Sequence, residues 1–398
     1  MKENFLRELA DIQTGPFGSQ LHKEDYVADG TPIVTVEHLG NKMFSEQNLP
    51  RVSNTDKNRL KKYVLKQGDI VFSRVGSVDR CSYVDQKHDG WMFSGRCLRV
   101  RPTSEIDSEY LYYYFCLEET KQFVRNIAVG ATMPSINTKL LGEVVVTFPE
   151  LEQQKRISGI LSAIDSKIEV NQKINDNLEQ QAAALFKSWF VDFSLFGGTV
   201  PENWEDTTLE NITTLITRGI APKYSNDSDQ TVINQKCIRN HTIDLSLARS
   251  HTPKAINEKW LQFGDLLINS TGDGTLGRVA QVWFTPKSLT VDSHVTIVRP
   301  AREELIFYIG LWGILHEKEI ESLHTGSTGQ TELPRDRVKM LKLLLPDNIS
   351  LSRFNSIIAP MASTIILNQE ENQKLASLRD TLLPKLMSGE IDVSSIQL

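Results

Sequence analysis

The feature that most constrains the fold is a heptad pattern of apolar residues that occurs twice, once near the middle of the chain and once at its end. The first copy, with alternating steps of four and three residues, contains Ile157, Leu161, Ile164, Ile168, Asn171, Asn175, Leu178, Ala182, Leu185 and Trp189. The second copy follows it by 197 residues at every position and contains Phe354, Ile358, Met361, Ile365, Asn368, Asn372, Leu375, Arg379, Leu382 and Leu386. Such a pattern predicts two long helices that share a register and pack along one seam.

The two predicted helices set the dimensions of the molecule. Each pattern extends over about 35–38 residues, or roughly 55 Å at about 1.5 Å per residue. Antiparallel packing would hold the globular modules at opposite ends of a rigid spacer. We expect the apolar seam to consist of Ile157, Leu161, Ile164, Ile168, Leu178, Phe354, Ile358, Met361, Ile365 and Leu375.

Two pairs of asparagines interrupt the seam at matching positions. Asn171 and Asn175 correspond to Asn368 and Asn372. If the pairs face each other, they fix the register of the helices at some cost in stability. Exposure to solvent at the edge of the seam explains the asparagines equally well.

The segments before each helix also repeat. They contain short β-branched and aromatic runs bounded by Gly, Pro and Asp, which is typical of strands. The corresponding segments are turns at 66–69 and 262–265, strands at 70–73 and 266–269, strands at 96–101 and 294–299, helices at 109–125 and 305–318, and last strands at 140–148 and 338–345. Because strands and helices do not alternate regularly, we predict two tandem α+β modules in a pseudo-two-fold repeat, separated by two long antiparallel coiled-coil helices.

Composition narrows the class of protein. A chain of 398 residues can form two or more domains. No apolar run reaches the roughly 18–20 residues of a membrane span, and the N-terminus lacks the apolar segment of a secretory signal. Four scattered cysteines indicate reduced thiols, and no residues have the spacing of a zinc site. We therefore expect a cytoplasmic protein that does not bind a membrane and has no metal site.

The net charge of −6 is unusual for a nucleic-acid-binding protein, which is generally basic. Binding depends on the local patch rather than on the total, however. Basic residues do cluster between positions 51 and 101. Taken alone, that cluster is better explained as a solvated surface than as a binding site.

No catalytic motif is evident. The Gly-rich segment 271–277 lacks the Gly-Lys-Ser/Thr ending of a phosphate-binding loop and the spacing of a dinucleotide site, so it is better explained as a tight turn. Neither a metalloprotease His-Glu-x-x-His motif nor a Gly-x-Ser-x-Gly nucleophile turn is present. We therefore expect no catalytic residues.

Each module instead has two polar loops, one after a predicted strand and one before the last strand. Arg, Asn, Gln, Ser and Thr side chains can recognise base edges in the major groove, and loop amides and basic side chains can bind phosphate. Many polar loops look alike, but here they repeat at matching positions with different side chains. The candidate DNA-binding residues are Arg74, Ser77, Arg80, Thr132 and Ser135 in the first module, and Asn269, Thr271, Asp273, Arg278, Thr328 and Gln330 in the second.

Several longer segments resemble the specificity (S) subunits of Type I restriction-modification systems. These segments are the Gly-Asp turns at 68–70 and 264–266, residues 148–153, 185–193, 200–204 and 382–391. Together they extend over essentially the whole chain. One departure is Leu345-Pro-Asp-Asn-Ile-Ser350, which lacks the Glu-Gln pair present at Glu152-Gln153.

The resemblance implies two target-recognition domains that each bind half of a split, asymmetric DNA sequence. It also implies that the helices dock two methyltransferase (M) subunits, which use S-adenosylmethionine to methylate adenine. Two restriction (R) subunits that use ATP and Mg²⁺ complete such a complex. The chain itself would bind no cofactor and catalyse no reaction.

The implied domains are target-recognition domain 1 at 1–149, spacer helix 1 at 150–193, target-recognition domain 2 at 194–346, and spacer helix 2 with the C-terminal tail at 347–398. Two other functions fit the sequence less well. One is the DNA-reading portion of a self-contained methyltransferase or restriction enzyme, which would need a catalytic motif. The other is a coiled-coil scaffold, which would not select a DNA sequence.

Overall fold

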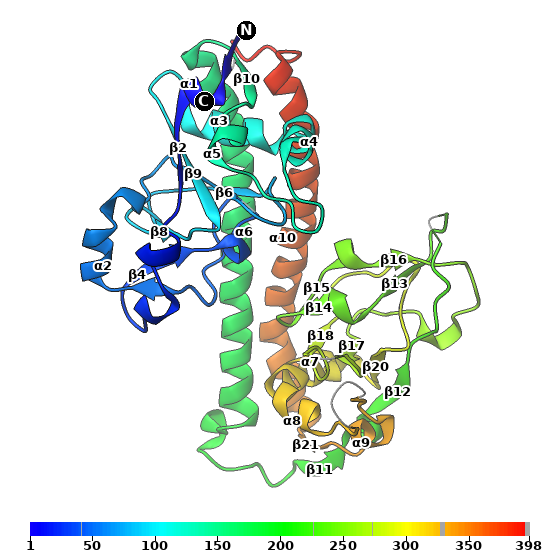
Figure 1. Cartoon of the computed structure of the whole chain (residues 1–398). Helices are drawn as coiled ribbons and strands as arrows, with labels where there is room; N and C mark the ends of the chain where they lie inside the picture. Colours follow the sequence, from blue (N-terminus) through cyan, green and yellow to red (C-terminus); the bar gives the residue numbers. More distant parts are fainter. Residues whose placement is uncertain (41, 226, 273, 327–330, 395–398) are drawn as a thin grey trace. The chain divides into compact units, whose positions relative to one another are not determined.

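The computed structural model describes residues 1–40, 42–225, 227–272, 274–326 and 331–394, and the chain divides into two compact units. Unit 1 comprises Met1–Val170 and Glu371–Leu398, and unit 2 comprises Asn171–Glu370. Two long helices are each shared by both units: α6 (Leu151–Phe190, 40 residues) and α10 (Asn348–Ser388, 41 residues). Figure 1 shows α6 in green and α10 in orange to red.

The described residues of unit 1 form three sheets. Its central sheet has the order β2-β9-β6-β7 and is antiparallel throughout, the second has the order β3-β5-β4-β8, and β1 pairs with β10. The strands are β1 (Lys2–Phe5), β2 (Ala10–Thr14), β3 (Tyr26–Val27), β4 (Thr31–Val34), β5 (Arg51–Val52), β6 (Ile70–Ser73), β7 (Cys81–Tyr83), β8 (Met92–Phe93), β9 (Cys97–Pro102) and β10 (Val145–Phe148). The shorter helices are α1 (Leu6–Leu9), α2 (Asn54–Arg59), α3 (Ser108–Cys116), α4 (Glu118–Ile127) and α5 (Thr138–Leu141).

Unit 2 repeats this arrangement. Its central sheet, β12-β20-β17-β18, has the same order as that of unit 1, and β11 pairs with β21 as β1 pairs with β10. The strands are β11 (Glu205–Thr208), β12 (Thr213–Arg218), β13 (Thr231–Ile233), β14 (Ile238–Arg239), β15 (Thr242–Ile243), β16 (Arg249–Ser250), β17 (Leu266–Asn269), β18 (Val279–Gln281), β19 (Leu289–Val291), β20 (Val295–Pro300) and β21 (Lys342–Leu345). The shorter helices are α7 (Ile306–Leu315), α8 (Glu317–Ser322) and α9 (Arg335–Lys339).

The predicted aromatic helix at 109–125 is in fact two helices. α3 ends at Cys116 because Leu117 is extended, with ψ of 135°, and α4 begins at Glu118. This break lets the aromatic residues of α3 enter the core of unit 1, where Phe115 packs edge-on against Phe72 with ring centroids 4.7 Å apart. The last strand is also shorter than predicted, because residues 138–141 form α5.

The repeated Gly-Asp turn is explained by a buried ion pair. Gly264 has a φ of +90°, and the Asp265 carboxylate accepts a hydrogen bond of 2.8 Å from the Gln262 amide. Arg299, on β20, donates to both carboxylate oxygens of Asp265 at 2.8 and 2.7 Å. In unit 1 the same contacts join Gly68, Asp69, Lys66 and Arg101. Each pair ties the start of one central strand to the end of its neighbour.

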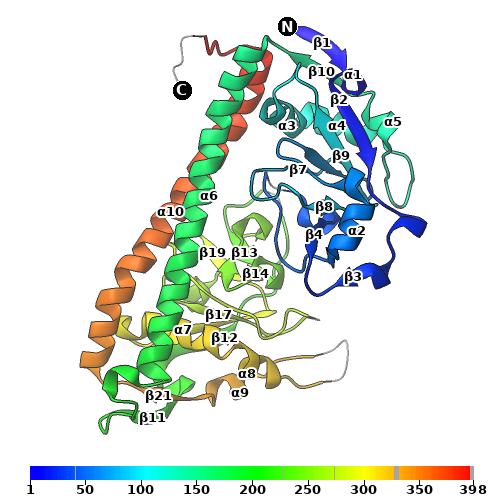
Figure 2. The ribbon, with the colours of Figure 1, turned by 90° about the vertical axis from the view of Figure 1, so that its left-hand side faces the viewer.

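The two long helices run antiparallel, as predicted, and lie side by side in both views (Figures 1 and 2). Within unit 1, Arg379 donates to Asp165 at 2.8 Å, and the Asn372 side chain donates to the Ile168 carbonyl at 3.5 Å. Within unit 2, the Asn175 side chain donates to the Ile365 carbonyl at 3.4 Å. The two asparagine contacts are equivalent under the 197-residue offset, so the internal repeat extends to individual hydrogen bonds.

Each predicted seam residue is buried or half-buried. Those that are buried are Ile157, Leu161, Phe354, Ile358 and Ile365, and those that are half-buried are Ile164, Ile168, Leu178, Met361 and Leu375. Asn171 and Asn175 are also buried, at 0% and 7% exposure, so solvent exposure does not explain them. Asn368 donates to Oδ1 of Asn175 at 2.8 Å.

The second long helix begins without the Glu-Gln pair of the first. Asp347 precedes its first residue and accepts hydrogen bonds from the amides of Ile349 and Ser350, at 2.9 and 3.0 Å. Its partial burial raises the pKa, but the hydrogen bonds from Ser350, Trp204 and Ile349 outweigh that effect and lower the pKa of Asp347 to about 2. Asp347 therefore caps the start of α10, where the Glu-Gln pair found at the start of α6 is missing.

Candidate nucleic-acid interface

The two polar loops of unit 1 lie side by side, although about 55 residues separate them in the sequence. The Ile136 amide donates to the Arg74 carbonyl at 2.9 Å, and the Gly76 amide donates to the Pro134 carbonyl at 2.8 Å. Val129 and Ser135 exchange backbone hydrogen bonds and close the second loop. We call residues 74–80 and 129–136 the loop face of unit 1.

The loop face of unit 2 is built in the same way. The Leu333 amide donates to the Ser270 carbonyl at 2.8 Å, as Ile136 does to Arg74 in unit 1. Thr325 and Glu332 exchange backbone hydrogen bonds of 2.8 and 2.9 Å and close the second loop. We define this loop face by the described residues within 270–278 and 325–333. The backbone thus brings the predicted loops together in both units.

The predicted residues of unit 1 are accessible. Ser77, Arg80 and Thr132 are exposed, and Arg74 and Ser135 are half-buried. The guanidinium of Arg74 donates to the Gly95 carbonyl at 3.3 Å and lies 5.8 Å from the ring centroid of Phe17. A single long hydrogen bond leaves most of the donors of that guanidinium available.

Arg80 lies against the backbone of a different loop. A Cβ atom at Gly40, whose φ is +139°, would come within 2.5 Å of Nη2 of Arg80. The carboxylate of the neighbouring Asp79 pairs with Arg125 at 2.5 Å rather than with Arg80. Glycine at position 40 therefore makes room for the guanidinium at the loop face.

The predicted residues of unit 2 differ in accessibility. Thr271 and Arg278 are half-buried, whereas Asn269 is 0% exposed and donates to the Gln235 carbonyl at 3.0 Å. Asn269 therefore positions a neighbouring segment in this structure, and we leave it out of the proposed DNA contacts. Asp273, Thr328 and Gln330 lie outside the described residues.

Four residues beside the loop faces were not among the predicted DNA-binding residues. Phe17 and Arg96 are exposed near Arg74, with Phe17 61% exposed. In unit 2, Gln235 and His294 contact Thr271. Arg96 and His294 occupy matching positions just before β9 and β20, so the repeat itself could have identified them. No sequence signal links Gln235 to Thr271.

The His294 segment is held by a buried carboxylate. Asp292 is 3% exposed and accepts a hydrogen bond of 2.9 Å from the His294 amide. Burial raises the pKa of Asp292, although this amide and the nearby imidazole act in the opposite direction. The turn before β20 is therefore fixed from inside the unit, and the imidazole lies on the outside.

The basic cluster predicted between residues 51 and 101 is smaller in the structure. Arg99 is 2% exposed and paired with Asp11, Arg101 is paired with Asp69, and Arg59 donates to Asp56. Arg99 and Arg101 therefore stabilise unit 1 rather than form a binding surface, whereas Arg59 remains exposed. The exposed members of the cluster are Arg59, Lys61, Lys62, Lys66, Arg80 and Arg96.

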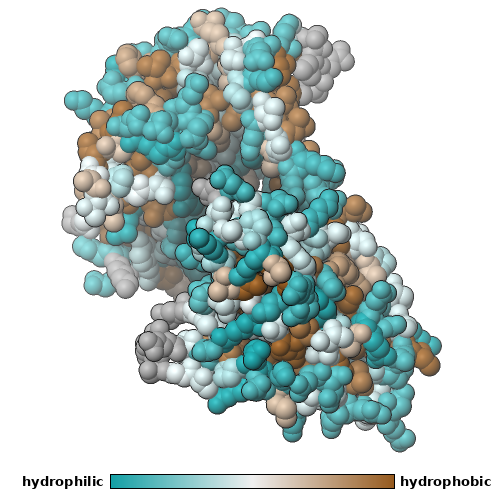
Figure 3. Space-filling model, turned by 90° about the vertical axis from the view of Figure 1, so that its right-hand side faces the viewer, coloured by the Kyte–Doolittle hydropathy of each residue, from teal (hydrophilic) through white to brown (hydrophobic). Residues whose placement is uncertain are grey.

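On the face drawn in Figure 3, hydrophilic residues are interspersed with apolar ones. Among the helices that the structure describes, none is both long and apolar enough to cross a membrane. The described residues also contain no group of three or more His, Cys, Asp or Glu side chains that could hold a metal ion.

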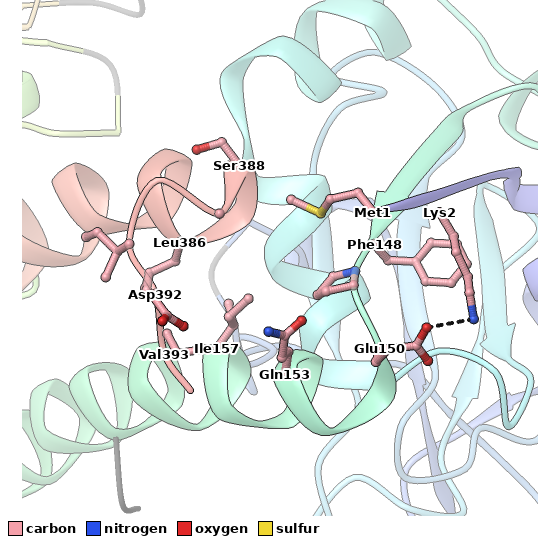
Figure 4. Close-up of a pocket in the computed structure, with 13 residues that line it drawn as sticks. Met1, Lys2, Phe148, Glu150, Gln153, Ile157, Leu386, Ser388, Asp392 and Val393 are labelled. Carbon is pink, nitrogen blue, oxygen red and sulfur yellow. Dashed lines mark ion pairs between the residues drawn. The ribbon is translucent and has the colours of Figure 1, made fainter. Parts of the chain in front are cut away.

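A cavity of about 440 Å³ lies in unit 1, away from the loop face. Its lining comes from the start of the chain, the first turns of α6 and the end of α10 with the following tail (Figure 4). Lys2 and Glu150 form an ion pair of 3.0 Å at its edge, and both side chains are largely exposed. Mixed lining and exposed charges give this cavity no arrangement typical of a catalytic site.

Comparisons with known proteins agree with the geometry. Residues 1–180 match the family model described as the Type I restriction modification DNA specificity domain. The MjaIX specificity subunit of a Type I restriction enzyme from Methanocaldococcus jannaschii is 27% identical over 323 residues, which are 75% of this chain and 72% of that protein. The HindI specificity subunit from Haemophilus influenzae is 24% identical and aligns with 83% of this chain and 88% of its own length.

A solved structure shows the same fold. It is the S subunit of a Type I restriction-modification system from M. genitalium, with a TM-score of 0.57 and 17% identity. The alignment includes 97% of this chain and 95% of that chain. The duplicated sheets, the shared antiparallel helices and these matches together make the chain similar to the specificity subunits of Type I restriction-modification systems.

Proposed function

We propose that this chain is the DNA-sequence-recognition subunit of a Type I restriction-modification complex and that each loop face binds one half of a split target in double-stranded DNA. The observation that carries the proposal is the pair of loop faces. The same backbone hydrogen bonds, Ile136 to Arg74 and Leu333 to Ser270, assemble both faces. A scaffold that is kept while its side chains change is suited to recognising two different sequences.

The chemistry of the two faces supports an asymmetric target. Unit 1 presents the guanidinium groups of Arg74, Arg80 and Arg96, which suit the acceptors of guanine or phosphate. Unit 2 presents amide, hydroxyl and imidazole groups at Gln235, Thr271 and His294, together with the half-buried Arg278. A face with three arginines and a face with mixed donors and acceptors favour different base edges, so the two halves of the target should differ in sequence.

We further propose that the chain acts with other subunits and is not itself catalytic. Its relatives are named as specificity subunits of restriction enzymes, which supports division of labour between subunits. On this proposal, two methyltransferase subunits dock on the helix pair, bind S-adenosylmethionine and methylate adenine, and two restriction subunits supply ATP- and Mg²⁺-dependent cleavage.

Sequencing of methylated adenines tests the proposal directly. Cells that carry the chain with its partner subunits should show methylation at one split motif, and cells in which only this chain is deleted should lose it. If the motif is unsplit, or persists without the chain, the proposal is wrong. As a second test, the purified chain alone should transfer no label from S-adenosylmethionine to DNA, and activity there would contradict the non-catalytic assignment.

The contact at Arg74 can be tested on the purified complex. Arg74→Ala should weaken binding to the specific target by about 1–3 kcal/mol if the guanidinium contacts a base edge. Arg7→Ala is a matched control, because Arg7 is exposed outside the loop face and paired with Glu143. Equal losses of affinity on specific and random DNA would instead make Arg74 a phosphate contact.

A further inference from the structure

Three polar side chains from separate parts of unit 2 meet beside the loop that follows β17. Oγ1 of Thr271 lies 2.7 Å from Nδ1 of His294 and 3.3 Å from Oε1 of Gln235. Gln235 begins the short helix η7 (Gln235–Cys237), and His294 directly precedes β20. His294 is exposed and the other two residues are half-buried, so DNA could reach this cluster.

The hydrogen bonds within the cluster determine which atoms remain for a ligand. The Thr271 hydroxyl has one proton to donate. When that proton goes to Oε1 of Gln235, the hydroxyl oxygen accepts from Nδ1–H of His294, and Nε2 of the neutral imidazole is then an acceptor. The Gln235 amide nitrogen keeps its donors. The cluster thus presents one donor, from Gln235, and one acceptor, from His294.

The result does not depend on the orientation of the Gln235 amide. If the amide is turned over, its nitrogen donates to the Thr271 hydroxyl, which then donates to Nδ1 of His294. Nε2 of the neutral imidazole then carries the proton and becomes the donor, while the amide oxygen of Gln235 becomes the acceptor. With both contacts to Thr271 kept, the neutral cluster again presents one donor and one acceptor.

We propose that Gln235, Thr271 and His294 recognise an adenine in the half-site bound by unit 2, a proposal that rests on the proposed function. In the major groove, adenine presents the N7 acceptor and the N6 amino donor side by side, so it matches one donor and one acceptor. Guanine presents two acceptors, N7 and O6, and would require two donors. Thr271 makes no base contact on this proposal, because it sets the proton positions of its two neighbours.

The repeat argues against a purely structural role for the cluster. The matching positions in unit 1 are identified by shared backbone hydrogen bonds: Arg74 to Arg96 and Ser270 to His294, and His38 to Thr35 and Cys237 to Asn234. At these positions unit 1 has Val36, Val75 and Arg96. The scaffold therefore forms without a polar cluster here, and the three side chains are specific to the surface of unit 2.

The decisive variant is Thr271→Val, which keeps the shape of the side chain and removes the hydroxyl that relays the protons. Methylated adenines would be sequenced in cells that carry the whole system with this variant, with Thr271→Ser and with the wild-type chain. We expect Thr271→Val to relax one specified adenine·thymine position in one half of the motif and to leave the other half unchanged. Thr271→Ser should keep the wild-type motif.

Competition binding with the purified complex gives the magnitude. For Thr271→Val, the preference for the original target over one substituted at that position should fall roughly tenfold, the order expected for one well-formed contact to a base edge. Thr364→Val is a matched control, because Thr364 is exposed on α10 and its hydroxyl donates to the Pro360 carbonyl. This control should keep both the motif and the preference, and melting curves would verify that all three variants are folded.

Two failures can be told apart. If the wild-type system methylates no split motif, the proposed function fails and the cluster has no half-site to recognise. If the motif is split but folded Thr271→Val leaves it unchanged, or relaxes a guanine·cytosine position instead, the adenine assignment is overturned while the proposed function stands.

Discussion

Replacing Asn368 alone by leucine should destabilise unit 2 more than replacing Asn368 and Asn175 together. In the helix seam the Asn368 side chain donates to Oδ1 of Asn175 at 2.8 Å, and Asn175 is only 7% exposed. Asn368→Leu removes the donor and leaves Oδ1 of Asn175 inside the seam. Because water cannot easily reach that oxygen, the single substitution strands a buried acceptor.

The expected magnitudes follow from burial. An acceptor left without its donor in a buried site costs about 1–3 kcal/mol. Asn175→Leu with Asn368→Leu removes both polar groups and buries apolar area instead, at up to about 1.5–3 kcal/mol per fully buried leucine. Asn175 also loses its 3.4 Å bond to the Ile365 carbonyl, which is long and contributes little. The double variant should therefore be as stable as the wild type or more stable.

Urea unfolding followed by tryptophan fluorescence suits this experiment, because five of the six tryptophans lie in unit 2 and only Trp91 lies in unit 1. The two single variants and the double variant form a double-mutant cycle with the wild-type chain. Asn177→Leu is the matched control, since Asn177 is exposed on the same helix and its replacement should change stability by less than about 0.5 kcal/mol.

The cycle should give a coupling free energy of about 1–3 kcal/mol between the two positions. Strictly additive effects of the two substitutions would refute the reasoning, because they would mean that the asparagines do not depend on each other. A double variant less stable than both single variants would also refute it.

Three further predictions concern other parts of the fold. Arg299→Met removes both hydrogen bonds that Asp265 receives from Arg299 and should cost about 3–5 kcal/mol in urea unfolding, because Asp265 is fully buried and burial already raises its pKa; a change below the error of the fit would contradict this. The pKa of Asp347, about 2 in the folded chain against a usual 3.8, means that its stabilisation is complete above the usual value and is lost as the pH falls through the folded one. Asparagine can still cap the helix but does not titrate, so Asp347→Asn should weaken the dependence of the urea midpoint on pH between those two pH values. If the midpoint of the variant changes with pH as steeply as that of the wild type, Asp347 does not cause the dependence. Deleting one heptad from each long helix shortens it by roughly 10 Å, equivalent to about three base pairs, so the gap in the methylated motif should change, and a constant gap would show that the helices do not set it.

The helices and the duplicated framework could be predicted from the sequence because both rest on local patterns. The heptad spacing of residues such as Ile157 and Phe354 identifies the seam, and both are buried there. The Gly-Asp turns were visible as a motif, but their partners were not. Arg299 lies 34 residues from Asp265, and only the antiparallel pairing of β17 with β20 brings the two together.

The loop faces were predictable only in part. Their positions follow from the repeat, but the exposure of each side chain depends on the local turn. Asn269 ends β17 with its side chain directed inward, and Thr271, two residues later, is accessible. Gln235 reaches Thr271 because helix η7 brings a distant segment to the same place, and no periodicity in the sequence reports that approach.

The division of the chain between the two units has a consequence for its synthesis. Unit 2 is one continuous stretch of sequence, whereas the core of unit 1 includes Leu383, Leu386 and Met387 from the far end of the chain. Although residues 1–170 precede unit 2 in the sequence, unit 1 cannot complete its core until residues 383–387 have been synthesised. A chain whose synthesis stops before these residues therefore leaves the core of unit 1 incomplete, with apolar surface exposed to aggregation.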